Sequence, residues 1–75
     1  MEQYKNLGGD SAVVSYALES GAITVQFRDG AIYVYNNHSA GAANINEMHR
    51  LAVMGQGLNS FIGRFVRKRY VRKLR

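Results

Sequence analysis

The segment ITVQFRDGAIYVY, residues 23–35, decides the fold. Its first half alternates apolar and polar residues without exception, which is the pattern of a half-buried β-strand. Asp29-Gly30 follows, and such a pair is typical of a two-residue hairpin turn, because that turn requires positive φ angles. Residues 31–35 are rich in β-branched and aromatic side chains and predict the returning strand.

A two-residue loop would fix the register of this hairpin and sort its side chains onto two faces. Phe27 would lie opposite Ile32, and Val25 opposite Val34. The expected core face then holds Ile23, Val25, Phe27, Ile32 and Val34. The other face holds Thr24, Gln26, Arg28, Tyr33 and Tyr35.

An earlier strand is predicted over residues 12–18. If its turn to the next strand closes as Ser20-Gly21, then Leu18, Tyr16 and Val14 join the core face, which we favour. A three-residue turn would instead move Tyr16 to the face of the other tyrosines. Val14 and Tyr16 share a face in both cases, because their spacing is two residues.

Helical periodicity replaces the alternation from residue 44 onward. Asn44 and Glu47 resemble a capping box, which starts a helix by pairing its free N–H groups. Its apolar stripe is Ile45, Met48, Leu51 and Ala52, and the helix is expected to end at Gly55 and Gly57.

A second amphipathic helix is predicted from Leu58, Phe61, Ile62 and Phe65. Arg69 and Arg72 would fall on that apolar face, so we expect the helix to stop near Arg67. Residues 68–75 would then continue as an extended tail that could pair with a sheet edge.

These patterns predict an α+β fold, a three-stranded antiparallel β-meander followed by two α-helices on one face and a basic C-terminal tail. The 75 residues suit one small domain. We expect its core in residues 11–67, a loose lead-in over residues 1–10 and the tail over residues 68–75. Because no apolar run suits a membrane span or a signal peptide, we expect a cytoplasmic protein without a membrane partner.

The charge is concentrated at one end of the chain. The net charge is +5, with ten Lys and Arg against five Asp and Glu. Seven of the ten bases lie in residues 64–75, whereas residues 1–63 carry a net −2. This asymmetry predicts a polyanion or an acidic protein surface as partner.

Little in the sequence supports catalysis or metal binding. There is no cysteine. His38 and His49 lack the further ligands that zinc needs, and the acidic residues are scattered. Gly55-Gln56-Gly57 completes neither a P-loop nor a dinucleotide-binding motif, so a tight turn between helices is favoured over an anion site. We expect no enzyme, no cofactor and no metal.

Tyr33 and Tyr35 admit two interpretations. On an exposed sheet face they could stack on bases, as aromatic residues of RNA-binding sheets do. If the helices cover that face, both belong to the core with their hydroxyl groups bonded at its rim, and the two predicted helices favour this interpretation. Tyr70 could stack on a base or pin the tail to the domain.

The chain resembles the KTSC domain family, whose central feature is a Y-x-Y motif, here Tyr33-Val34-Tyr35 preceded by Val25-Gln26-Phe27. The resemblance covers roughly residues 11–72 and includes Val14-Ser15-Tyr16, Gly21-Ala22-Ile23, Leu58-Asn59, Tyr70 and Arg72. The chain has no proline where the family has Val-Pro before its first helix. The family is named for a domain at the C-terminus of some lysyl-tRNA synthetases, and this association implies RNA as a ligand.

Two functions remain open at this point. The first is a small non-enzymatic nucleic-acid-binding module, with RNA favoured, that grips phosphates with its basic end and stacks bases on tyrosines. Its candidate binding residues are Tyr33, Tyr35, Asn59, Arg64, Arg67, Lys68, Arg69, Tyr70, Arg72, Lys73 and Arg75. The second is a protein-interaction or regulatory module whose basic tail docks on an acidic partner. The sequence indicates no oligomeric state.

Overall fold

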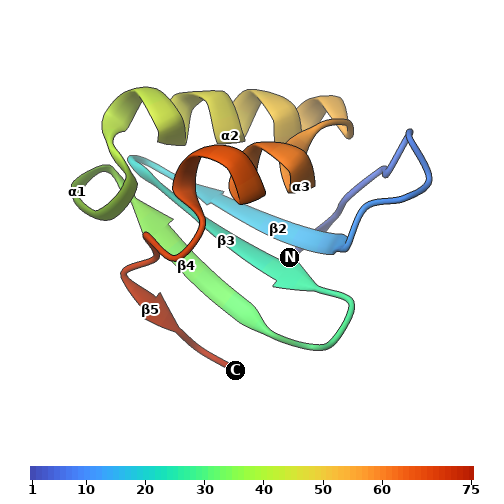
Figure 1. Ribbon diagram of the computed structural model, residues 1–75, viewed down its shortest axis with the longest axis horizontal. Coiled ribbons are helices and arrows are strands. Elements are labelled where there is room, and N and C mark those ends of the chain that lie inside the picture. The colour runs from blue at the N-terminus through green and yellow to red at the C-terminus, as the bar shows by residue number, and fades with distance from the viewer.

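A computed structural model describes all residues, 1–75. The strands form one antiparallel sheet in the order β1 (Glu2–Gln3), β2 (Val13–Glu19), β3 (Ala22–Phe27), β4 (Ile32–Asn36) and β5 (Arg72–Lys73). The helices are α1 (Asn37–Ala40), α2 (Ala42–Met54) and α3 (Leu58–Phe61), which continues into a π-helical turn, η1 (Ile62–Val66). Helices α2 and α3 cover one face of the sheet and leave the other bare (Figure 1). The α+β class is confirmed, but the sheet has five strands where three were predicted.

The β3–β4 hairpin closes with a three-residue loop, so the prediction of a two-residue turn was wrong. The Phe27 N–H donates to the Ala31 carbonyl at 2.9 Å, and the Gly30 N–H donates to the Phe27 carbonyl at 2.9 Å. Gly30 has φ +91°, and the Asp29 carboxylate accepts from the Ala31 N–H at 2.9 Å. A turn followed by a left-handed glycine is the usual form of a three-residue hairpin loop.

The extra loop residue shifts the register by one and exchanges the two faces of β4. Tyr33 lies opposite Val25, and Tyr35 lies opposite Ile23. Both tyrosines therefore lie on the helix-covered face, where Ile23 and Val25 are fully buried as predicted. The two residues of β4 that were predicted for the core, Ile32 and Val34, lie on the bare face instead.

The β2–β3 turn closes as the favoured two-residue Ser20-Gly21 turn, with Glu19 opposite Ala22. Tyr16 is 8% exposed and belongs to the core as predicted. The pairing shifts between Val13 and Ser15, and this bulge buries Val13 and exposes Val14. Val14 and Tyr16 therefore do not share a face.

Leu18 was also predicted to join the core, and this prediction was wrong, because its side chain is 40% exposed.

Helix α2 begins at Ala42, so the prediction that Asn44 caps its start was wrong. The Asn44 side chain instead donates to the Ala40 carbonyl at 2.8 Å. The capping box lies at α1, where Asn36 accepts from the Ser39 N–H at 2.8 Å and Ser39 accepts from the Asn36 N–H at 3.1 Å. The predicted stripe is confirmed, because Ile45, Met48, Leu51 and Ala52 are all buried, and α2 ends at a left-handed Gly55 with φ +82°.

The last helix follows its predicted stripe only for part of its length. Leu58 and Ile62 are buried, but Phe65 is 51% exposed and Val66 is 1% exposed. The Arg67 N–H donates to the Ile62 carbonyl, five residues back, at 2.6 Å. This wider turn rotates the helix so that Val66 replaces Phe65 in the core. The chain leaves the helix at Arg67, as predicted.

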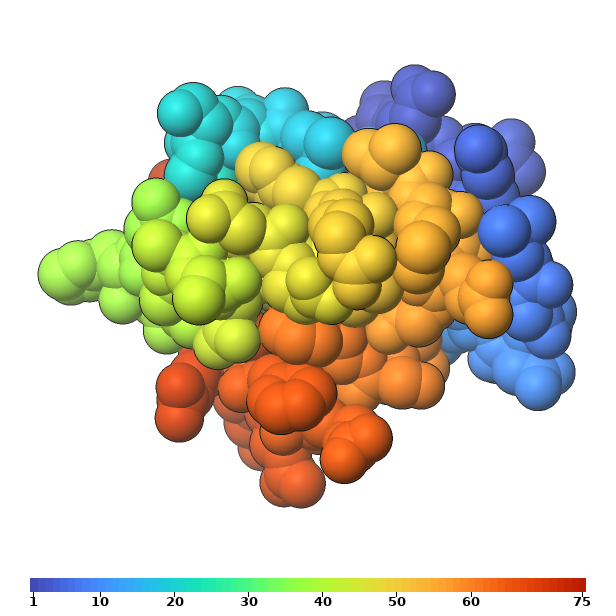
Figure 2. All heavy atoms as spheres, turned by 90° about the horizontal axis from the view of Figure 1, so that it is seen from above, coloured from blue at the N-terminus to red at the C-terminus, as the bar shows by residue number.

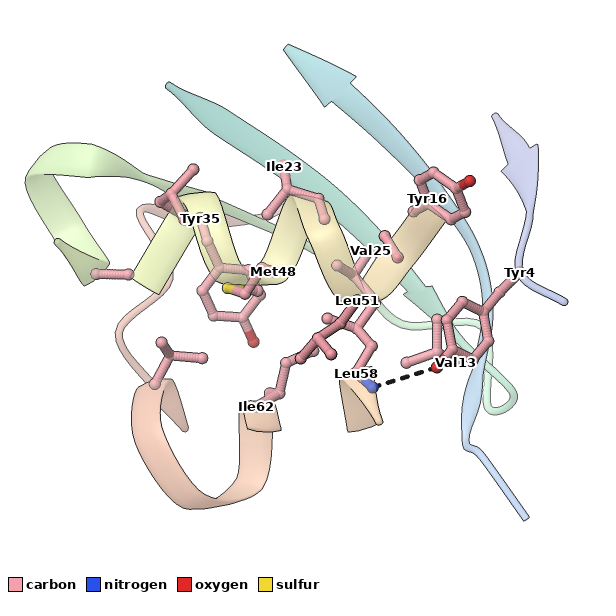
Figure 3. Close-up of a cluster of buried hydrophobic side chains, with 14 residues drawn as sticks. Tyr4, Val13, Tyr16, Ile23, Val25, Tyr35, Met48, Leu51, Leu58 and Ile62 are labelled. Atoms are coloured by element: carbon pink, nitrogen blue, oxygen red, sulfur yellow. Dashed lines mark hydrogen bonds between the residues drawn. The ribbon is translucent and has the colours of Figure 1, made fainter. Parts of the chain in front are cut away.

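Both ends of the chain join the sheet. Strand β1 pairs with β2, and Tyr4 is 3% exposed with its hydroxyl oxygen accepting from the Leu58 N–H at 3.2 Å (Figure 3). The expectation of a loose lead-in is therefore wrong at Tyr4. Strand β5 pairs antiparallel with β4, which is the edge pairing expected of the tail. None of the helices has the length and apolar character needed to cross a membrane.

Candidate nucleic-acid interface

Four aromatic side chains gather where β3, β4 and the C-terminal segment meet. The ring centroids of Tyr33 and Tyr70 are 4.6 Å apart, with the rings tilted by 46°. Phe27 meets Tyr33 edge-to-face at 5.8 Å, and Tyr35 meets Tyr70 edge-to-face at 6.3 Å. Tyr70 therefore pins the tail to the sheet through aromatic contacts, which is one of the two roles considered for it.

These rings line an open groove of about 570 Å³, a volume within the usual range of ligand sites. We call it the aromatic groove. Its walls are formed by Ala12, Phe27, Arg28, Asp29, Ala31, Tyr33, Tyr35, Ile62, Arg67, Lys68 and Tyr70. The last helix contributes Ile62 to these walls, and the β3–β4 loop contributes Arg28 and Asp29. Figure 2 shows the helices seen from above, with the C-terminal segment emerging at one side of them.

The cations around the aromatic groove have no acidic partner within the chain. The one ion pair of the molecule joins Arg50 and Glu47 on α2, at 2.5 Å, and the hydrogen bond from Arg50 lowers the pKa of Glu47. At the groove, the Lys73 ammonium lies 5.7 Å from the centroid of the Tyr33 ring, a cation–π contact. The rim therefore offers unneutralised positive charge next to aromatic surface.

Tyr35 is a core residue and cannot stack on a ligand. It is 2% exposed and points from β4 into the space between the sheet and the helices (Figure 3). Its hydroxyl donates to the Arg67 backbone carbonyl at 3.3 Å. Burial raises the pKa of Tyr35 to about 12, with smaller contributions from Tyr33 and Tyr70. The core interpretation is thus confirmed for Tyr35, whereas Tyr33 is only half-buried.

The remaining candidate residues are distributed over several surfaces. Arg64 lies beside Phe65, with its guanidinium 5.7 Å from that ring. Asn59 lines a separate polar pocket near Gly55 and Gly57. Arg69, Arg72 and Arg75 are exposed along the tail.

Strand β5 divides its own cations between the two faces of the sheet. Arg72 lies opposite Val34, on the bare face, whereas Lys73 lies opposite Tyr33, on the groove side. The structure therefore brings Tyr33, Tyr35, Arg67, Lys68, Tyr70 and Lys73 together, and it leaves Asn59 and Arg64 apart from them.

Two groove residues were missed at the level of sequence. Phe27 was assigned to the core alone, although it is half-buried and lines the groove. Arg28 was assigned to the tyrosine face without a role. A three-residue loop, also compatible with a glycine at position 30, would have placed Phe27 beside Tyr33.

Comparison with known proteins adds no assignment. No family model, no curated protein and no solved structure shows a significant match to this chain. The resemblance to the KTSC domain family therefore stands as a proposal that rests on the residues quoted for it.

Proposed function

We propose that this chain is a small non-enzymatic nucleic-acid-binding module, with RNA favoured, and that its basic C-terminal end binds phosphates. The observation that carries the proposal is that none of the seven cations in residues 64–75 forms an ion pair. An unpaired cation can neutralise a phosphate and release counterions, which is the main source of affinity for nucleic acids.

The anchoring of the tail supports this role. Strand β5 is bonded to β4, and the Leu74 N–H donates to the Ile32 carbonyl at 2.7 Å. The backbone that carries Arg72 and Lys73 is therefore ordered before binding, which lowers the entropic cost of binding. Because the remainder of the chain carries a net −2, the C-terminal end is the part of the chain that attracts a polyanion.

The preference for RNA rests on the resemblance to the KTSC domain family. We also propose that the chain belongs to this family. Under this proposal Tyr35 serves the fold and not the ligand, since its ring is buried. An acidic protein surface would use the same cations, so the test must separate the two partners.

The proposal is tested by titrating the full chain with single-stranded RNA, with DNA of the same length and with an acidic peptide at several salt concentrations. We expect RNA to bind most tightly, and log K to fall against log salt by about 0.7 for each phosphate neutralised. The variant in which Arg69, Arg72 and Arg75 become Gln should flatten this slope by about 2, because all three side chains are exposed and free of ion pairs.

Lys5→Gln is the matched control, since Lys5 is an exposed cation outside the basic end. It should leave the slope unchanged. If the triple variant keeps the wild-type slope, or if RNA does not bind at low salt, the proposal is wrong. Tighter binding to the acidic peptide than to RNA would favour the protein-interaction alternative.

A further inference from the structure

The aromatic groove leaves part of its ring surface open to solvent. Phe27, Tyr33 and Tyr70 are each half-buried and pack against the core, and all three line the groove. Ile62, the first residue of η1, lines the groove from the side of the last helix. Exposed aromatic surface gathered in one concave place is typical of a binding site.

Cations from three parts of the chain lie at the rim of this groove. Arg28 belongs to the β3–β4 loop, whereas Arg67 and Lys68 follow the last helix. Lys73 reaches the Tyr33 ring from β5. The one acidic side chain in the groove is Asp29, whose carboxylate accepts a hydrogen bond from the Ala31 N–H. The rim therefore carries a net positive charge around an apolar floor.

We propose that the aromatic groove receives unpaired nucleic-acid bases, so that the module selects single strands over duplexes. This inference rests on the proposed function and adds the part of the ligand that the groove binds. A nucleotide offers both a flat ring for stacking and an adjacent phosphate for the rim cations. An apolar peptide side chain would use only the rings, and a phosphate alone would use only the cations.

Duplexes cannot use the groove in the same way. Paired bases are stacked on one another inside the double helix, and only unpaired bases can place a ring face against Tyr33, Tyr70 or Phe27. A duplex would still contact the exposed cations of the tail through its phosphates. The groove therefore adds selectivity to an attraction that the tail supplies to any polyanion.

The test compares three ligands with the full chain at several salt concentrations, beginning at low salt. They are a single-stranded RNA, a strand with the same number of phosphates but without bases, and a duplex. We expect removal of the bases to weaken binding by about 5- to 150-fold, the range for loss of one stacked base. The dependence on salt should stay the same, because the number of phosphates does not change.

Variants locate this effect within the groove. Tyr33→Leu and Tyr70→Leu replace a stacking ring by an apolar side chain and should remove most of the difference between RNA and the base-free strand. Phe65→Leu is the matched control, because Phe65 is an exposed aromatic residue of the same basic end that does not line the groove. It should keep the full difference. Thermal unfolding of each variant checks that it folds. If a variant does not fold, the comparison of ligands on the wild-type protein still tests the proposal.

The outcomes separate the groove from the proposed function. Equal binding of RNA and the base-free strand, or a duplex that binds as tightly as RNA, would overturn the base site and leave the phosphate-binding tail intact. Retention of the full difference in both tyrosine variants would also overturn it. No binding to any strand at low salt, or preferential binding of an acidic peptide, would overturn both proposals together.

Discussion

The hydrogen bond between Tyr4 and Leu58 provides a test of whether the N-terminal segment belongs to the fold. Leu58 is the first residue of α3, and its N–H has no partner within the helix. The Tyr4 hydroxyl oxygen accepts from this N–H at 3.2 Å, with Tyr4 3% exposed and Leu58 fully buried (Figure 3). Tyr4→Phe removes the acceptor and keeps the ring.

The cost of this substitution is the cost of leaving a buried N–H without a partner, about 1–3 kcal/mol. The contribution of the ring is retained, because Tyr4 meets Tyr16 edge-to-face at 6.5 Å and phenylalanine can do the same. In a domain of this size each kcal/mol lowers the melting temperature by roughly 4–8 °C. We therefore expect a fall of at least about 4 °C.

Thermal and urea unfolding followed by circular dichroism would measure this effect. Tyr16→Phe is the matched control, because the Tyr16 ring is also largely buried, whereas its hydroxyl is not a buried atom without a partner. Its stability should stay within about 0.5 kcal/mol of wild type. If Tyr4→Phe is as stable as Tyr16→Phe, the segment contributes no buried hydrogen bond, and the loose lead-in expected from the sequence describes it better.

Three further predictions concern the folded domain. Gly30→Ala should lower the free energy of unfolding by about 1–2 kcal/mol, all of it from the left-handed backbone, because a Cβ there meets no atom within 4 Å. Gly55→Ala should lower it further, because its Cβ would lie 2.5 Å from the Lys5 Cβ. Urea unfolding would compare the two variants. Met48→Ala should cost about 2–5 kcal/mol in the same assay, since Met48 is fully buried. The stability that Tyr35 contributes should be constant below its ordinary pKa of 10.0 and decrease as the pH rises toward about 12, because the unfolded state loses the proton first. Unfolding measured against pH should show this loss in wild type and not in Tyr35→Phe.

Features determined by neighbouring residues were predictable from the sequence. The four buried residues of α2 follow from a stripe at helical spacing, and the end of α2 follows from Gly55 in the left-handed conformation. The end of the last helix near Arg67 also follows from local chemistry, because two arginines would otherwise enter the apolar face. These predictions required no knowledge of contacts between distant segments.

The hairpin register depended on contacts that the sequence does not show. Gly30 suits a two-residue and a three-residue loop equally well, because both place a glycine at positive φ. The choice is made by the packing of Tyr33 and Tyr35 under the helices, next to Ile23 and Val25. In the same way, no residue type in the strand over residues 12–18 indicates the bulge between Val13 and Ser15.

The basic half of the candidate site could be predicted, and the aromatic half could not. The concentration of cations in residues 64–75 is visible in the composition alone. The groove requires Phe27 from β3 and Tyr70 from the tail to contact Tyr33. That meeting depends on the register of β4 and on the pairing of β5, which are both tertiary features.

The end of the last helix links the two halves of the site. The wide turn that ends at Arg67 brings Val66 into the core, and the residues that follow it, Arg67 and Lys68, line the groove. It also directs the chain back toward β4, where β5 pairs and Tyr70 packs against Tyr33. Because the Tyr35 hydroxyl holds the Arg67 carbonyl, the buried tyrosine of the pair positions the exit of the tail, while the half-buried one faces the groove. The two tyrosines that the sequence places together therefore have different roles, one in the fold and one at the proposed site.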